Sequence, residues 1–116
     1  MTVRTDFDGM WPPLLDVQAI VTPTRHTLVL TGELEITSAG ELQDLVARIC
    51  DEGAGRDLAL DLTGLTFLDS TGLQAIIVAQ RLCREAQIGF MLTPARGAVQ
   101  NLLEITGLTD VLPFSA

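Results

Sequence analysis

Short runs of apolar and β-branched residues recur along the chain and predict strands. Residues 14–21 (LLDVQAIV) and 26–32 (HTLVLTG) are separated by the turn-forming TPTR, so we expect a hairpin or two neighbouring strands. Two later runs have the same character, DLALDL at 57–62 and FMLT at 90–93. The chain therefore contains at least four short strands.

Between and after these strands, apolar residues repeat at the period of a helix. In the first such segment, Ser38 precedes Glu41 at capping-box spacing, Gly53 supplies the stop, and the apolar positions are Leu42, Leu45, Val46 and Ile49. A second helix is predicted from about Thr71 to Ala86, and a third within residues 95–107 that Gly107 closes. TGLTF at 63–67 is predicted to be a loop, and 108–114 (LTDVLPF) a last short extended piece.

The predicted order is two strands followed by helices that alternate with strands, β-β-α-β-α-β-α, with a final strand left open. Repeated strand-to-helix succession predicts an α/β domain with a mainly parallel sheet covered by helices. The chain has 116 residues, 47% of them hydrophobic, which is enough for one domain with a buried core. We assign residues 1–13 to an N-terminal arm carrying Trp11 and residues 14–116 to the domain.

Composition and charge exclude several classes of partner. The formal net charge is -8, and the seven basic residues are arginines scattered singly, so neither a nucleic acid nor an anionic membrane surface is expected as a partner. No apolar run is long enough for a signal peptide or a membrane span, which favours a cytoplasmic protein. Cys50 and Cys83 are predicted to be small buried hydrophobes in a reducing compartment.

The residues do not assemble into a catalytic or metal-binding motif. His26 is the only histidine and is predicted to be a surface or strand-edge residue. The carboxylate pairs, Glu33 with Glu35 and Asp57 with Asp61, have the spacing of solvated strand faces rather than of an acid/base couple. No enzyme activity and no cofactor are therefore predicted for this chain.

The stretch FLDSTGLQ, Phe67 to Gln74, allows two interpretations. Asp69, Ser70 and Thr71 are all good N-caps, and Thr71 has capping-box spacing to Gln74, so the stretch can simply start a helix. It can also present Ser70 as a phosphoacceptor, because a helix N-terminus offers free N–H donors and the positive end of the helix dipole to a phosphate. Local rules favour the first interpretation.

The helix that follows adds a second feature. Its predicted sheet-facing stripe consists of Ala75, Val78, Ala79, Leu82 and Ala86, with Cys83 at the edge. Its polar side carries Gln74, Gln80, Arg81, Arg84 and Gln87. Leu73 and Ile77 fall on that polar side, in line with Ser70. These two residues are either isolated exposed apolar side chains or part of a protein contact surface that a phosphate would switch off.

Three segments together resemble one known family. They are LTGELEITSAGELQDLV (30–46), LALDLTGLTFLDSTGLQAIIVAQRLCREAQ (58–87) and LLEITGLTDVLPF (102–114), in this order and at this spacing. From about Asp16 to Phe114 the chain resembles the STAS-domain anti-sigma factor antagonists of bacteria. The fold of that family, a small sheet of mixed direction flanked by helices, agrees with the order derived above.

The resemblance implies a partner-switching cycle. Ser70 corresponds to the serine phosphorylated in the family, supported by Asp69, Thr71 and Gly72. The unphosphorylated protein would bind an anti-sigma factor that is also a serine kinase, and a serine phosphatase would reset it. ATP and metal would belong to those partners, and a monomer or weak dimer is expected. The expected partner-binding residues are Leu73, Gln74, Ile77, Arg81, Glu33 and Glu35.

This sequence departs from the family pattern in two places. Glu35 stands where the family often has aspartate near the phosphosite, and AQIGF stands where a Gly-Gly pair is common. The second difference is expected to alter only the turn after the helix. A fixed scaffold subunit of a transporter or signalling assembly, without phosphorylation, is the alternative function.

Overall fold

The computed structural model describes residues 2–5, 14–110 and 112–114. Five strands form one sheet in the order β1-β2-β3-β4-β5. β2 pairs antiparallel with both β1 and β3, whereas β3, β4 and β5 run parallel to one another. The strands are β1 (Thr2–Thr5), β2 (Leu15–Val21), β3 (Arg25–Leu34), β4 (Asp57–Leu68) and β5 (Phe90–Thr93). The predicted pairing of the first two predicted strands and the mixed sheet with flanking helices are confirmed, with two of the four strand pairs parallel.

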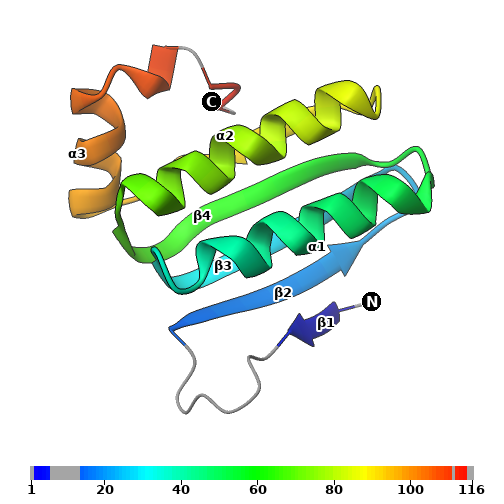
Figure 1. Ribbon diagram of the computed structural model, residues 1–116, viewed down its shortest axis with the longest axis horizontal. Coiled ribbons are helices and arrows are strands. Elements are labelled where there is room, and N and C mark those ends of the chain that lie inside the picture. Colours follow the sequence, from blue (N-terminus) through cyan, green and yellow to red (C-terminus); the bar gives the residue numbers. More distant parts are fainter. Residues whose placement is uncertain (1, 6–13, 111, 115–116) are drawn as a thin grey trace.

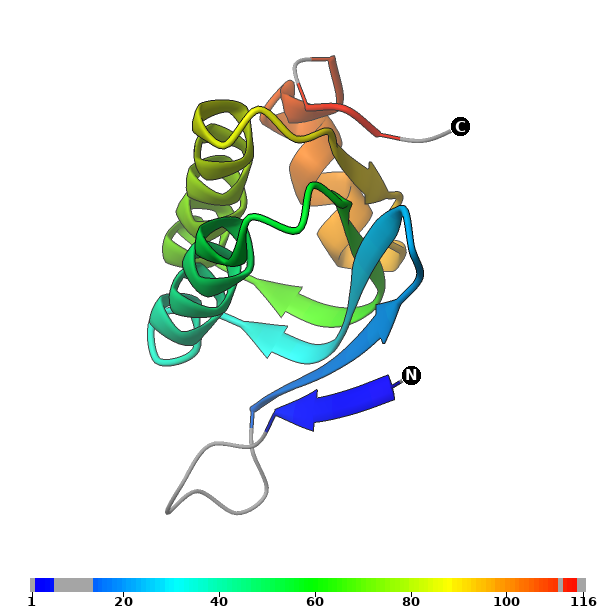
Figure 2. The same cartoon turned by 90° about the vertical axis from the view of Figure 1, so that its right-hand side faces the viewer.

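Three helices pack on this sheet. They are α1 (Ala39–Glu52), α2 (Ser70–Glu85) and α3 (Gly97–Ile105), each close to its predicted limits. α1 and α2 lie side by side on one face of the sheet (Figures 1 and 2), and α3 packs against β4. No helix among residues 14–110 is long and apolar enough to cross a membrane. The predicted order β-β-α-β-α-β-α is therefore the observed order from β2 to α3.

The core lies between the sheet and the α1–α2 layer. Its largest side chains come from alternate positions of β3 and β4, where Leu28 is paired with Leu60 and both are fully buried. α1 contributes the predicted helical stripe, of which Leu42, Val46 and Ile49 are buried and Leu45 is half-buried against the core. The apolar face of α1 and the inward-facing side chains of β3 and β4 thus remove one another from water.

β4 is longer than predicted. The segment 63–67, expected to be a loop, continues the strand to Leu68. Leu65 and Leu68 are buried, and register shifts between β3 and β4 after Val29 and Gly32 absorb the irregularity. The polar threonines made this segment look like a loop, but bulged pairing lets the strand continue.

The N-terminal end contains a strand that was not predicted, and the C-terminal end contains less extended structure than predicted. Thr2–Thr5, assigned to the arm, pairs with β2 as an edge strand, while Trp11 and the rest of the arm lie outside the described residues. At the other end, the predicted extended piece begins instead with a 3-10 turn, Leu108–Asp110. Among the described residues after Asp110, Phe114 alone forms a bridge, with Leu92 of β5, so the final strand that the sequence left open is a single pair there.

Of the two predicted cap signals of α1, one is confirmed. Gly53 ends the helix with φ 66° and donates its N–H to Cys50 O. The capping box from Ser38 to Glu41 is wrong, because Ser38 makes no side-chain cap. Its hydroxyl is buried and used by the preceding loop, as described below.

The turn after α2 places a side chain in a backbone conformation that favours glycine. Gln87 has φ 60°, at the place where the sequence departs from a common Gly-Gly pair. We expect Gln87→Gly to raise the free energy of unfolding by about 0.5–1 kcal/mol, because glycine adopts this conformation without steric cost. Urea denaturation measures the change. Gln80→Gly, inside α2, is the control and should lower stability by about 1 kcal/mol. A loss of stability in Gln87→Gly would contradict the prediction.

Candidate functional site

Ser70 is the first residue of α2, directly after β4 and one extended residue. Its side chain is exposed. The connection from β3 to α1 lies at the same end of the molecule, because the carboxyl ends of the parallel strands β3 and β4 meet there (Figure 1). Two loops distant in sequence therefore flank this serine.

Asp69 joins these two loops through its two carboxylate oxygens. Oδ1 accepts a hydrogen bond from the Gly72 N–H at 2.8 Å, which caps α2. Oδ2 accepts one from the Ile36 N–H at 3.2 Å, which holds the β3–α1 loop. Asp69 is thus the N-cap, whereas Thr71, for which the sequence showed capping-box spacing, lies half-buried inside the first turn.

Gly72 lets α2 approach the end of β3 closely. A Cβ at this position would lie 2.8 Å from the carbonyl carbon of Leu34 and 2.9 Å from Cδ1 of Leu68, and closer still to the Leu34 carbonyl oxygen. The Asp69 N–H also donates to Leu34 O at 3.4 Å. Gly72 is therefore required by packing, and the close approach that it allows fixes the position of Ser70 at the start of α2.

The β3–α1 loop is held by its own polar side chains. Ser38 is 2% exposed, and its hydroxyl donates to Glu33 O at 2.9 Å and accepts the Glu35 N–H at 3.0 Å. The Glu35 carboxylate accepts the Thr37 N–H at 2.8 Å and the Thr37 hydroxyl. The structural role of Glu35 beside the site is therefore to stabilise the β3–α1 loop.

Four residues of α2 that the sequence placed on its outer side are exposed in the structure. Ser70, Gln74, Ile77 and Arg81 are all exposed and follow one another at steps of three or four residues. These four residues, here called the α2 ridge, form one surface with Ser70 at its end.

The assignment of the buried face of α2 is partly wrong. Leu73 is half-buried against the core rather than exposed, and Ile76, which was not assigned to the stripe, is fully buried. Val78 and Leu82 of the predicted stripe are only half-buried. The reason is that α2 packs beside α1 as well as on the sheet, which turns its buried face toward α1.

Sequence reasoning missed two apolar residues near the site. Ile36, in the loop tied to Asp69, is 69% exposed, and Phe67, near the end of β4, is 47% exposed. Ile77 of the α2 ridge is 36% exposed. A single apolar residue between polar neighbours, as in EITS and TFLDS, was the available signal. Ile36 and Ile77 lie on the loop and the helix that meet at the Ser70 end, which is typical of a protein contact surface. Phe67 precedes Leu68, which faces Gly72 of α2, so the Phe67 side chain points to the other face of the sheet.

The STAS domain profile matches residues 16–116, most of the chain. The chain belongs to the STAS domain family. An anti-sigma-B factor antagonist from Bacillus subtilis (strain 168) is 28% identical over 87 residues, covering 75% of this chain and 78% of that protein.

Solved structures confirm the STAS fold. An anti-sigma factor antagonist from Mycobacterium paratuberculosis matches with a TM-score of 0.64 and 22% identity, covering 98% of this chain and 83% of the other. The Bacillus cell fate determinant SpoIIAA in its phosphorylated form matches with a TM-score of 0.66 and 18% identity, covering 86% of this chain and 91% of the other.

The other carboxylate pair of this STAS domain, Asp57 and Asp61, has structural hydrogen-bond partners. Asp57 accepts the Gly89 N–H at 2.9 Å. Asp61 accepts the Thr63 hydroxyl at 2.6 Å and the Thr93 hydroxyl at 2.9 Å. Burial opposes the charged form of Asp61, but these hydrogen bonds outweigh it and lower its pKa. Both carboxylates therefore hold neighbouring segments of the sheet together through hydrogen bonds.

His26 lies at the opposite end of this STAS domain from Ser70. It is half-buried at the start of β3, next to Glu52 and Arg56, and burial lowers its pKa while Glu52 opposes that shift. Within residues 14–110 and 112–114, no three His, Cys, Asp or Glu side chains are grouped to hold a metal ion.

Proposed function

We propose that this STAS domain is an anti-sigma factor antagonist whose partner binding is switched off by phosphorylation of Ser70. The observation that carries the proposal is the position of Ser70, an exposed hydroxyl on the first residue of a capped helix. The relatives named anti-sigma factor antagonists, and the phosphorylated form of SpoIIAA, support it.

A phosphate on Ser70 is compatible with the fold and changes the surface. The N-terminal turn of α2 offers N–H donors and the positive end of the helix dipole, so the helix tolerates the group. The phosphate adds about -1.5 to -2 charges beside Asp69, in a protein whose net charge is already -8. A partner surface that fits the unmodified serine would then meet a bulky anion.

The proposed partner surface consists of the α2 ridge together with Ile36. It combines two exposed apolar side chains with the Gln74 amide and the Arg81 guanidinium, the composition expected of a contact surface. Glu33, which is half-buried, and Glu35, which holds the loop, act mainly as its support. Leu73 is also a supporting residue, because it packs inward.

In the proposed cycle, other proteins add and remove the phosphate. The partner is an anti-sigma factor with serine kinase activity, which uses ATP, and a serine phosphatase removes the phosphate. This chain acts as a cytoplasmic regulator of transcription without enzyme activity or a cofactor of its own, as a monomer or weak dimer.

The test uses wild-type protein, Ser70→Ala and Ser70→Asp as baits in an extract of the source cells supplied with ATP. We expect Ser70→Ala to retain a protein kinase, whereas wild type should acquire one phosphate on its Ser70 peptide and retain less of that kinase. We expect Ser70→Asp to bind that kinase about tenfold more weakly. Phosphate only at other positions would contradict the switch. Equal binding by all three baits would favour a fixed scaffold.

A further inference from the structure

The two cysteines of the chain lie together, at the end of the helix pair that is remote from Ser70. Cys50 is in the last turn of α1 and Cys83 in the last turn of α2. Both are free thiols, and the Cys50 and Cys83 side chains interact with each other across the helix interface. The sequence predicts two separate buried hydrophobes, because the contact between them depends on how α1 and α2 pack.

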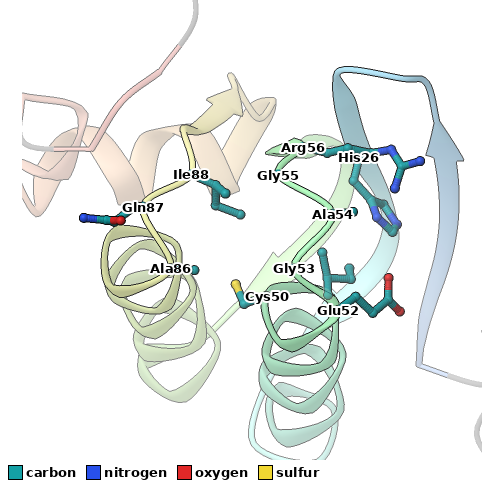
Figure 3. Close-up of a pocket in the computed structure, with 11 residues that line it drawn as sticks. His26, Cys50, Glu52, Gly53, Ala54, Gly55, Arg56, Ala86, Gln87 and Ile88 are labelled. Atoms are coloured by element: carbon teal, nitrogen blue, oxygen red, sulfur yellow. The ribbon is translucent and has the colours of Figure 1, made fainter.

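The two thiols differ in access. Cys83 is fully buried in the core, whereas Cys50 is half-buried and lines a pocket of about 220 Å³ between the ends of the two helices. Figure 3 shows the Cys50 sulfur directed into the space between α1 and the turn that carries Ala86 and Ile88. Small residues of the turn after α1, Gly53 to Gly55, border the same pocket. A small molecule can therefore reach Cys50 first.

We propose that Cys50 and Cys83 are a redox-active pair, which a small organic disulfide converts into an intramolecular disulfide between α1 and α2. Cys50, reached through the pocket, is the attacking thiol, and Cys83, protected behind it, is the resolving thiol. The proposal does not depend on the function proposed above.

The exchange balances without any further reactant. The Cys50 sulfur, after losing its proton, attacks one sulfur of the oxidant, forms a mixed disulfide and releases the other half as a thiol. The Cys83 sulfur then loses its proton and attacks the Cys50 sulfur, which releases the second half as a thiol. Two protein thiols are oxidised, and one small disulfide is reduced to two thiols.

The resting state of this pair is the reduced one. Burial raises the pKa of the Cys50 thiol, and it raises the pKa of Cys83 to about 12. Since only the thiolate attacks, exchange in the folded protein is slow, and excess oxidant is needed to drive it. The test below therefore supplies the small disulfide in large excess.

Intact-mass spectrometry of the folded wild-type chain, treated with excess dithiodipyridine and then analysed without reductant, tests the proposal. We expect a monomer that has lost two hydrogen atoms, and a peptide map in which Cys50 is joined to Cys83. The melting temperature should rise by roughly 10 °C, because the disulfide closes a loop of about 30 residues, and dithiothreitol should reverse the rise.

Two variants separate the roles of the thiols. Cys83→Ala should stop at one mixed disulfide on Cys50, and Cys50→Ser should leave Cys83 unmodified while the protein is folded. The wild-type mass alone decides the proposal if either variant folds poorly. A lasting mixed disulfide on wild-type Cys50, a disulfide-linked dimer, or no reaction of either thiol would overturn it.

Discussion

Replacing Gly72 by alanine is expected to lower the free energy of unfolding by about 3 kcal/mol. The added methyl would lie 2.8 Å from the carbonyl carbon of Leu34 and 2.9 Å from Cδ1 of Leu68. One of these contacts is backbone, so relief requires α2 to move away from β3 rather than a side chain to rotate. That movement strains the hydrogen bonds that Asp69 makes to Gly72 and Ile36. Urea denaturation measures the loss.

Gly40→Ala is the matched control for this substitution. Gly40 is exposed in the first turn of α1, and a Cβ there would meet nothing within 4 Å. Alanine is a better helix former than glycine, so this variant should be neutral or more stable by up to about 1 kcal/mol. If Gly72→Ala proved as stable as the wild type, the close docking of α2 on β3 would be contradicted.

Ile77→Glu is expected to weaken binding of the captured kinase by at least about 30-fold, with little change in stability. Ile77 is 36% exposed at the middle of the α2 ridge, so the glutamate can reach solvent in the free protein. In the complex, the same carboxylate would be buried against an apolar partner surface without a counter-charge, which costs about 2 kcal/mol or more. Titration calorimetry measures the affinity, and thermal denaturation checks the fold.

Ile105→Glu is the control for this effect. Ile105 is also an exposed isoleucine, at 83%, but it ends α3 instead of lying on the α2 ridge. This substitution should leave the affinity unchanged. Equal losses in both variants would point to net charge as the cause, and a large loss of stability in Ile77→Glu would mean that this residue belongs to the core.

Local patterns predicted most of the fold because they reflect local physics. The period of two in β2 and β3, the period of 3.6 in α1 and the stop at Gly53 need no knowledge of the tertiary structure. The exposed ridge from Ser70 to Arg81 could also be read from helical spacing alone.

The misses involve residues whose role depends on distant neighbours. The predicted buried face of α2 left out Ile76, which is fully buried. The sequence does not show that α1 packs beside α2, and this contact decides which face is buried. Ser38 looked like a cap, but its hydroxyl is used by Glu33 and Glu35. The hydrogen bond from Ile36 to Asp69 joins residues 33 apart, so no local rule predicts it.

Asp69 also limits which amino acids this position of the domain can accept. Two backbone donors from different loops are satisfied by one short side chain, and each uses a separate oxygen. Asparagine has one acceptor oxygen and would turn an NH₂ group toward the second donor, while serine and threonine supply a single oxygen. Each of these three replacements therefore weakens the tether to one of the loops. Asp69, which tethers two loops, and Gly72, which packing requires, are therefore the two neighbours of the serine that the geometry constrains most.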